Sequence, residues 1–331
     1  MNDQHQNGKV STSKRWARGC LFWFGASLAT LLSLALVGYL YEPWAEARDA
    51  KANPPPGQLV DVGGYSLHIH CTGSGSPTVV IESGWGDSSA AWAGVQPEVA
   101  KTTRVCTYDR AGMGWSEASP EPRMAREFAK ELHTLLAKAN EPGPYVLVGH
   151  SMGGFTILVY AHDYPDEVSG LVLVDAQKLP ASDAASFNPA PKPGVNLLPS
   201  WIARIGLVRL LSGPLGSVKD LPEQEKQAYK AYSVAPRSAQ TFIDEGMGMS
   251  EGGAQAKAVS TLGALPLIVL SAGLDETADH TASQAGFLLL SSNSQQFFAE
   301  ESGHEIHIEQ PKAAVAAILQ MVQQVRETGT R

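Results

Sequence analysis

Cysteine is scarce in this chain, and its scarcity excludes two kinds of small scaffold. The 331 residues include three cysteines, Cys20, Cys71 and Cys106. None lies in a CxxC pair, so neither a thiolate zinc site nor a disulfide framework is expected. Cys71 and Cys106 can pair if the domain is exported, and two buried free thiols are the alternative. The sequence leaves both open.

Positive charge is also in short supply. The chain has 25 lysines and arginines against 33 aspartates and glutamates, a net charge of −8, with no basic cluster outside the N-terminus. Proteins that bind nucleic acid present such a cluster to the phosphates. A nucleic-acid partner is therefore not expected. A hydrophobic content of 44% is ordinary for a globular chain with a buried core.

Charge is absent altogether from residues 20–41, "CLFWFGASLATLLSLALVGYLY". At 1.5 Å per residue, this helix-forming run is long enough to cross the roughly 30 Å hydrocarbon layer of a membrane. Lysine and arginine dominate the tail before it (1–19), whereas acidic residues outnumber basic ones just after it. The positive-inside rule then predicts a single-pass anchor with residues 1–19 in the cytoplasm and the rest of the chain outside.

A cleaved signal peptide is the alternative to an anchor. "AEA" (Ala45–Ala47) resembles a small-residue cleavage site. The apolar run is longer than the usual hydrophobic region of a signal peptide, which favours an uncleaved anchor. Residues 42–57 are polar and end in three prolines, so they are expected to form a semi-rigid linker.

Short runs with strand character alternate with helix-like stretches from residue 58 onward. Several of the runs are continuous in valine, isoleucine and leucine, as in strands buried on both faces of a parallel sheet. This alternation predicts a doubly wound α/β domain over 58–176 and 265–331. The strand pattern stops over 177–264, which is too long for a connection and is interpreted as a helical cap insertion. His68 and His70 alternate with apolar residues and are expected on a solvated strand face.

The segment "YVLVGHSMGGF" has the strongest functional signal. An apolar strand-like run leads directly into Gly149-His150-Ser151-Met152-Gly153, and a helix-like stretch follows. In this context the GxSxG pattern predicts a nucleophile elbow, with Ser151 at the apex of a sharp turn. A serine hydroxyl needs an adjacent base to act as a nucleophile.

His304 is the candidate base, in "ESGHEIHIEQP" near the end of the chain. A zinc-binding HExxH helix places its histidines four residues apart, whereas His304 and His307 are three apart and no third ligand is obvious. We therefore expect no metal site. His307 is expected to be a surface or supporting residue.

Six segments of the chain together resemble the α/β-hydrolase fold family, in its cap-bearing, esterase-like branch. They are "ESGWGDSSAAW", "CTYDRAGMGWS", "YVLVGHSMGG", "HDYPDEVSGLVLVDA", "PLIVLSAGLDE" and "SGHEIHIEQP". The resemblance covers about residues 58–325 and implies a mostly parallel eight-stranded sheet flanked by helices. It also implies a Ser-acid-His order along the chain, with backbone amides of Trp85 and Met152 as the oxyanion hole. No cofactor is implied.

The acid of the triad has two candidates. Asp275 is preferred because it follows the apolar run "PLIVLS" and Gly273, and because the gap to His304 leaves room for one helix and the last strand. Asp175, at the end of "LVLVDA", is the alternative, since some lipases of the family place the acid there. Directly after it begins the predicted cap, where a strand-end carboxylate can instead cap a helix.

The resulting hypothesis is a membrane-anchored serine hydrolase that cleaves a small-molecule carboxylic ester. Ser151, His304 and Asp275 form its triad. An aminopeptidase-like or C–C bond hydrolase is the alternative on the same fold. A ligand-binding module without catalytic activity is the alternative from another class, and the presence of all three triad residue types argues against it.

Overall fold

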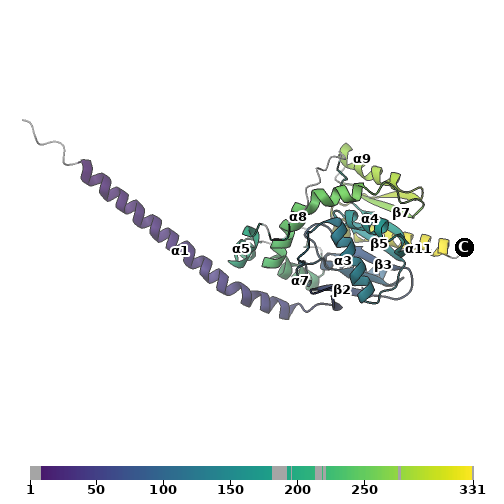
Figure 1. Cartoon of the computed structure of the whole chain (residues 1–331), viewed down its shortest axis with the longest axis horizontal. Coiled ribbons are helices and arrows are strands. Elements are labelled where there is room, and N and C mark those ends of the chain that lie inside the picture. Colours follow the sequence, from purple (N-terminus) through teal and green to yellow (C-terminus); the bar gives the residue numbers. More distant parts are fainter. Residues whose placement is uncertain are drawn as a thin grey trace, which may run out of the picture.

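A computed structural model describes residues 9–180, 192–194, 196–212, 218, 221–274 and 277–329, with side chains from Trp16 onward. The chain begins with one long helix, α1 (Lys9–Ala52), which extends away from the rest of the molecule (Figure 1). Within it, Trp16–Ala52 is long and apolar enough to be a candidate membrane span.

The body of the molecule is built on one eight-stranded sheet with the order β1-β2-β4-β3-β5-β6-β7-β8. β1, β2 and β4 pair antiparallel, and all other neighbours are parallel. The central strands are buried along their whole length, which explains their continuous apolar sequences. The strands are β1 (Gln58–Asp61), β2 (Ser66–Thr72), β3 (Thr78–Glu82), β4 (Val105–Tyr108), β5 (Tyr145–His150), β6 (Val168–Val174), β7 (Leu267–Ala272) and β8 (Ser294–Ala299).

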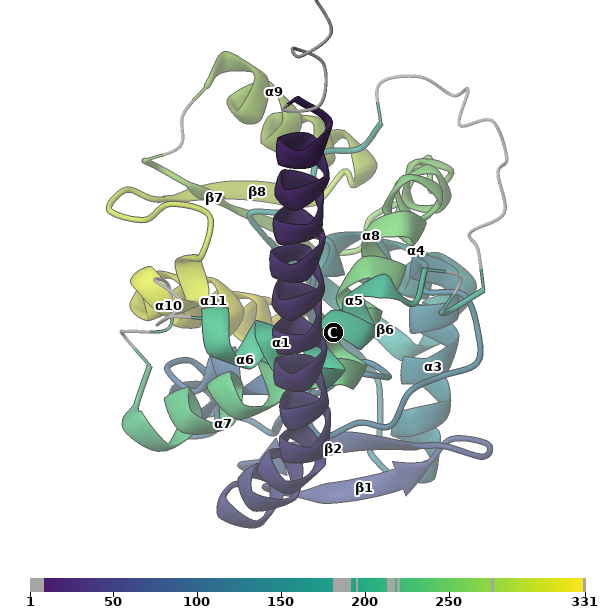
Figure 2. The same cartoon turned by 90° about the vertical axis from the view of Figure 1, so that its left-hand side faces the viewer.

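Helices cover both faces of this sheet and bury two separate apolar clusters against it. α3 (Ala125–Lys138), α4 (Gly153–Asp163) and the end of α9 (Ala278–Phe287) contribute to one cluster. α2 (Gln96–Val99) and α11 (Pro311–Gly329) contribute to the other. Figure 2 shows α3 and α4 on one side and α10 and α11 on the other. The short elements are η1 (Ser89–Trp92), η2 (Pro165–Glu167), η4 (Leu288–Leu290) and α10 (Ile306–Glu309).

The described residues of the 177–264 interval form four helices with connecting segments and contain no strand. They form α5 (Leu198–Arg204), α6 (Leu207–Leu211), α7 (Glu223–Ser233) and α8 (Pro236–Lys257). α8 contacts α3 and α4, whereas α5 and α7 contact α1. These helices therefore lie between the long N-terminal helix and the sheet domain (Figure 1).

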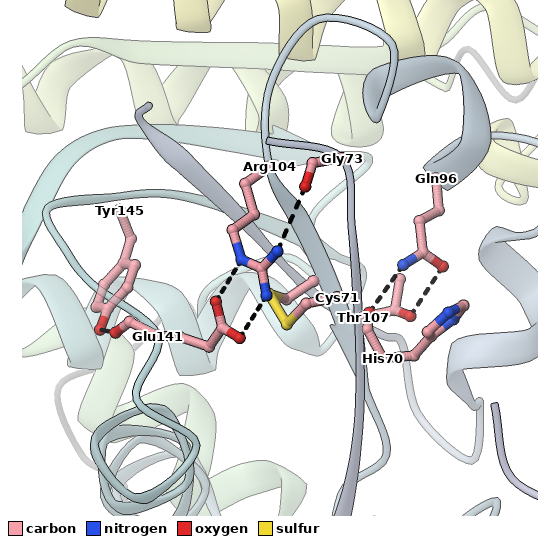
Figure 3. Close-up of a disulfide and its surroundings, with 9 residues drawn as sticks. His70, Cys71, Gly73, Gln96, Arg104, Thr107, Glu141 and Tyr145 are labelled. Carbon is pink, nitrogen blue, oxygen red and sulfur yellow. Dashed lines mark hydrogen bonds and ion pairs between the residues drawn. A yellow bond between two sulfur atoms is a disulfide. The ribbon is translucent and has the colours of Figure 1, made fainter. Parts of the chain in front are cut away.

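Cys71 and Cys106 face each other across β2 and β4 and form a disulfide. The close-up in Figure 3 shows Arg104 beside this bond, where its guanidinium pairs with Glu141 at 2.6 Å and donates to the carbonyl of Gly73. The disulfide therefore joins neighbouring antiparallel strands next to a partly buried ion pair. The free cysteine of the chain is Cys20 on α1.

The solvated-face prediction for His68 is wrong. Its side chain is fully buried, with Nδ1 2.8 Å from Asp109 Oδ2 and Nε2 2.5 Å from the Pro56 carbonyl. The ring of Trp115 packs on it at 4.8 Å between centroids. The residues after α1 and the segment after β4 cover this face of β2, and neither contact can be recognised from the alternation within the strand.

Candidate active site

Ser151 occupies the tight turn between β5 and α4, with a left-handed φ of 51°. The two glycines of the motif make this turn sterically allowed. A Cβ at Gly149 would lie 2.7 Å from the carbonyl oxygen of Gly153, and a Cβ at Gly153 would lie 2.7 Å from that of Glu82. Side chains at either position would displace backbone, so the chain holds Ser151 at the apex of the elbow.

His304 lies on the loop after β8, with Nε2 2.9 Å from Ser151 Oγ. The loop is fixed by its own contacts, because Gly303 N–H donates to the carboxylate of Glu309 at 2.7 Å and Leu274 N–H donates to the carbonyl of Ser302 at 3.0 Å. His150, the residue before the serine, donates from Nε2 to the carbonyl of His304 at 2.9 Å. The base is therefore held from both sides at hydrogen-bonding distance from the hydroxyl.

Asp175 supplies the carboxylate beside His304. Its Oδ2 lies 2.6 Å from His304 Nδ1, and its Oδ1 accepts the N–H of Ala272 at 2.9 Å. Burial alone would raise the pKa of Asp175, but these hydrogen bonds and the neighbouring imidazoles outweigh it and hold the pKa below its ordinary value. The carboxylate therefore stays ionised and can fix the tautomer of His304.

The sequence preference for Asp275 as this residue is not supported by the geometry. Asp275 and Glu276 lie outside the described residues, and the position next to His304 is taken by Asp175. The physical reason is the left-handed φ of 42° at Asp175, which turns its side chain at the carboxyl end of β6. Asp279, further along, is 75% exposed and pairs with Lys178 at 2.5 Å. The neighbouring His280, which the sequence analysis missed, has Nε2 3.0 Å from Asp175 Oδ1.

The predicted oxyanion amides belong to Met152, directly after the serine, and to Trp85, in the loop after β3. Among the described residues, neither N–H donates a hydrogen bond. The loop approaches Ser151 closely, since a Cβ on Gly84 would lie 3.4 Å from Ser151 Cβ and 2.7 Å from His150 Nδ1. The loop that carries Trp85 therefore lies beside the nucleophile, and the residue that directly follows the nucleophile is Met152.

The buried side chain of Arg110 fixes the loop after β3 by hydrogen bonds to its carbonyl groups. It donates to the carbonyls of Ser83 at 2.7 Å and Gly84 at 2.6 Å, and it pairs at 2.7 Å with both Glu82 and Glu245. Burial opposes its charge, but the two carboxylates prevail and raise its pKa above the ordinary value. Arg110 therefore fixes two carbonyls of the segment that leads into Trp85, whose N–H is the predicted oxyanion donor. The sequence analysis did not identify either glutamate.

α8 closes over the same loop. The indole of Trp85 stacks on Phe242 at 4.2 Å between centroids, and its Nε1 donates to the carbonyl of that residue at 2.8 Å. Gly86 N–H donates to Glu245 at 3.0 Å. The helical segment inserted between β6 and β7 therefore contacts the loop that carries one oxyanion amide.

His307 is fully buried, so the surface alternative for it is wrong. Its ring stacks on Trp92 at 4.4 Å and its Nε2 lies 3.4 Å from Asp87 Oδ2. Burial lowers the pKa of His307 to about 3 and raises those of Asp87 and Glu305 to about 7. Ligand atoms of these three residues and His150 lie within 4.8 Å of one another, so this is a group of described residues whose geometry could hold a metal ion.

Comparisons with known proteins agree with this architecture. The family described as the alpha/beta hydrolase fold matches residues 77–311. YqjL of Bacillus subtilis, an uncharacterized protein, is 28% identical over 78% of this chain and 88% of its own length. YbdG of Bacillus subtilis, also uncharacterized, is 30% identical over 45% of this chain and 47% of its own. A 2-hydroxymuconate semialdehyde hydrolase of Pseudomonas sp. is 33% identical over 37% of this chain and 44% of its own length. The chain thus spans less than half the length of these last two.

Solved structures show the same fold at low identity. A putative lipase from Acinetobacter baumannii superposes with a TM-score of 0.61 at 19% identity, over 86% of this chain and 96% of its own. An esterase from Thermogutta terrifontis superposes with a TM-score of 0.59 at 22% identity, over 81% of this chain and 98% of its own. The chain belongs to the α/β-hydrolase fold family. The family and these neighbours support a hydrolase as its class.

Proposed function

We propose that this chain is a serine hydrolase in which Ser151, His304 and Asp175 form the catalytic triad. The observation that carries the proposal is the continuous chain of hydrogen bonds from Ser151 Oγ through the imidazole of His304 to Asp175, at 2.9 and 2.6 Å. The preferred acid of the sequence analysis, Asp275, is replaced by Asp175 because the latter contacts the base.

In the first half of the reaction, Ser151 Oγ forms a bond to the substrate carbonyl carbon while its proton passes to His304 Nε2. The carbonyl oxygen becomes an oxyanion, which accepts hydrogen bonds from the backbone N–H groups of Trp85 and Met152. When the tetrahedral intermediate collapses, the bond to the leaving alcohol breaks and His304 returns the proton to that oxygen. Asp175 stabilises the imidazolium between these two steps.

Water completes the cycle by the same route. His304 removes a proton from water as its oxygen attacks the acyl carbon, and it then protonates Ser151 as the acyl–oxygen bond breaks. The products are a carboxylic acid and free enzyme. No cofactor takes part in this proposal, because every proton transfer is assigned to a residue of the triad.

A carboxylic ester is the proposed substrate class, in keeping with the esterase and lipase among the structural neighbours. C–C bond hydrolysis is the second candidate, and the similarity to a 2-hydroxymuconate semialdehyde hydrolase favours it. Both reactions use the same triad. Turnover of a panel of p-nitrophenyl acyl esters, compared with a vinylogous 1,5-diketone, tests the choice. Measurable ester turnover that is lost in Ser151→Ala supports the first candidate, and diketone cleavage alone supports the second.

We also propose that residues 20–41 of α1 anchor the protein in a membrane, with residues 1–19 in the cytoplasm and the catalytic domain outside. The basic tail and the acidic residues that follow the apolar run support this orientation. The Cys71–Cys106 disulfide supports it independently, because disulfides persist mainly outside the reducing cytoplasm. Residues 42–57 then connect the anchor to the hydrolase domain, formed by 58–176 and 265–331 with the cap at 177–264.

Protease added outside intact spheroplasts tests this orientation. The account expects digestion of the domain after Tyr41 and retention of the N-terminal fragment in the membrane. A mature form that begins near Arg48 would show a cleaved signal peptide instead.

A further inference from the structure

The cap contacts α1 inside its apolar run. Gly38, three residues before the end of that run at Tyr41, packs directly against the α5–α6 turn, and a Cβ there would lie 1.9 Å from the carbonyl oxygen of Ile205. Such a close backbone approach requires glycine at this point. At 1.5 Å per residue, the contact lies about 4.5 Å inside the end of the run. The cap therefore touches α1 at a level that the bilayer would surround.

The first charges after the apolar run are taken up by the same part of the cap. Glu42 is fully buried and pairs with Arg209 of α6 at 2.8 Å, and Asp49 pairs with the same guanidinium at 2.6 Å. Together with the Gly38 contact, these ion pairs fix the position of α5 and α6 along α1. In Figure 2, where α1 runs down the front of the molecule, α5 and α6 lie close to it.

Large apolar side chains cover the exposed side of these two short helices. Leu210 and Leu211 are 79% and 72% exposed, and Trp201 is 54% exposed. With two neighbours they form the surface we call the α5–α6 apolar surface: Leu197, Leu198, Trp201, Leu210 and Leu211. The apolar residues of α1 are similarly exposed, so both surfaces lack a partner within the described part of the chain.

We propose that the α5–α6 apolar surface rests in the interfacial layer of the bilayer that α1 crosses, so that the cap is a second membrane contact. A lipid bilayer is the partner that fits, because the α5–α6 apolar surface lies beside the end of the apolar run of α1, at the same depth in the membrane. Tyr39, Tyr41 and Trp44 lie at the end of the apolar run, where tyrosine and tryptophan are enriched in membrane proteins. Trp201 is exposed on α5, which contacts α1. Leucines on the outer side of short helices bury their apolar area at the same level. The proposal rests on the anchoring by α1 and does not depend on the identity of the catalytic residues.

Site-specific fluorescence on the full chain in liposomes tests this contact. Cys20→Ser removes the free thiol, and Leu210→Cys then carries an NBD label. The matched control is Leu289→Cys in the same background, because Leu289 is 87% exposed on η4 and lies outside the α5–α6 apolar surface. Flotation shows that each labelled protein is in the membrane, and its thermal unfolding in detergent shows that it is folded. A second labelled variant, Leu211→Cys, covers the case in which the first fails to fold.

The expected result is blue-shifted emission from the label at 210 or 211 that lipids brominated near the headgroup quench, with neither effect at 289. Water-like emission at 210 and 211, equal to that at 289, would overturn the proposal. Blue-shifted emission that brominated lipid leaves unquenched would also overturn it, since a protein partner or second copy would then cover the surface. Failure to float would remove the anchor and the proposal together, while leaving the ester-hydrolase proposal intact.

Discussion

Asp175 Oδ2 lies 2.6 Å from His304 Nδ1, although 129 residues separate the two in sequence. The contact arises because β6 and β7 are neighbours in the sheet, so the residue that ends β6 lies beside the loops that follow the last two strands. The amide of Ala272 on β7 fixes the second carboxylate oxygen. This contact is the observation behind the proposal that Asp175, directly after the sixth strand, is the acid of the triad.

Asp175→Asn should reduce kcat by about 10⁴-fold while the protein stays folded, because the amide no longer stabilises the imidazolium or its tautomer. Steady-state kinetics with an ester substrate, together with circular dichroism, measure both effects. Asp279→Asn is the matched control, since its carboxylate is exposed and, within the described part of the chain, pairs only with Lys178. Asp275→Asn should also retain most of the rate. If Asp275→Asn were inactive and Asp175→Asn active, the acid would belong after β7.

Gly84→Ala should lower kcat by about 10²- to 10³-fold, comparable to the loss of one oxyanion donor. The new methyl group would lie 2.7 Å from His150 Nδ1 and 3.4 Å from Ser151 Cβ, so the loop must move and carry the amide of Trp85 with it. KM should change less than kcat, because the amide acts on the oxyanion. Gly286→Ala on α9 meets nothing within 4 Å and should keep the wild-type rate. A wild-type kcat for Gly84→Ala would separate this loop from catalysis.

The buried His68–Asp109 pair should make stability depend on pH. Burial lowers the pKa of His68, but Asp109 and the Pro56 carbonyl outweigh it and raise the pKa above 6.5. Burial raises the pKa of Asp109, but His68 and the amides of Ser89 and Trp115 outweigh it and lower the pKa below 3.8. The contribution of His68 is present below pH 6.5 and is lost as the pH rises through its folded pKa. That of Asp109 is present above pH 3.8 and is lost as the pH falls through its folded pKa.

Denaturant unfolding at a series of pH values measures this dependence. The free energy of unfolding contributed by the pair should be greatest between pH 3.8 and 6.5 and should decline on the alkaline side. Asp109→Asn removes the charge that raises the pKa of His68, so the difference between wild type and variant should shrink at high pH. A difference that stays constant from pH 5 to pH 9 would contradict the paired-charge account.

Chelation should leave activity intact, because the proposed proton transfers need only the three triad residues. A metal ion could be held by donor atoms of Asp87, His150, Glu305 and His307, so loss of activity on chelation is the outcome that would contradict this expectation. The measurement is kcat before and after dialysis against EDTA, with elemental analysis of the purified protein. Inactivation that zinc reverses would assign a metal to this cluster.

Local features of the site could be predicted from the sequence, whereas those that depend on strand order could not. The elbow around Ser151 is encoded by two glycines and the flanking strand and helix, all within eleven consecutive residues, "YVLVGHSMGGF". His304 follows from its place after the last strand. The choice between Asp175 and Asp275 depends on which strand end faces His304 in space. Spacing along the chain favoured Asp275, whereas the described contact with His304 is made by Asp175.

Burial of polar side chains was the other limit of the sequence. His68 and His307 both contact residues that are distant in sequence, Asp109 and Trp92 respectively. Arg110 is likewise fixed by Glu245 of α8, 135 residues away. Such partners can be identified only from the folded structure. The periodicity of a strand shows which residues share a face, but it does not show which distant segment covers that face.

The central claim is that Ser151 is the nucleophile, and intact-protein mass spectrometry after reaction with a fluorophosphonate tests it most directly. The account predicts one covalent adduct per chain, located on Ser151 by peptide mapping and absent from Ser151→Ala. Reaction should be much slower in His304→Ala, because the hydroxyl then lacks its base. An adduct of equal yield in Ser151→Ala, or one mapped to another residue, would contradict the account.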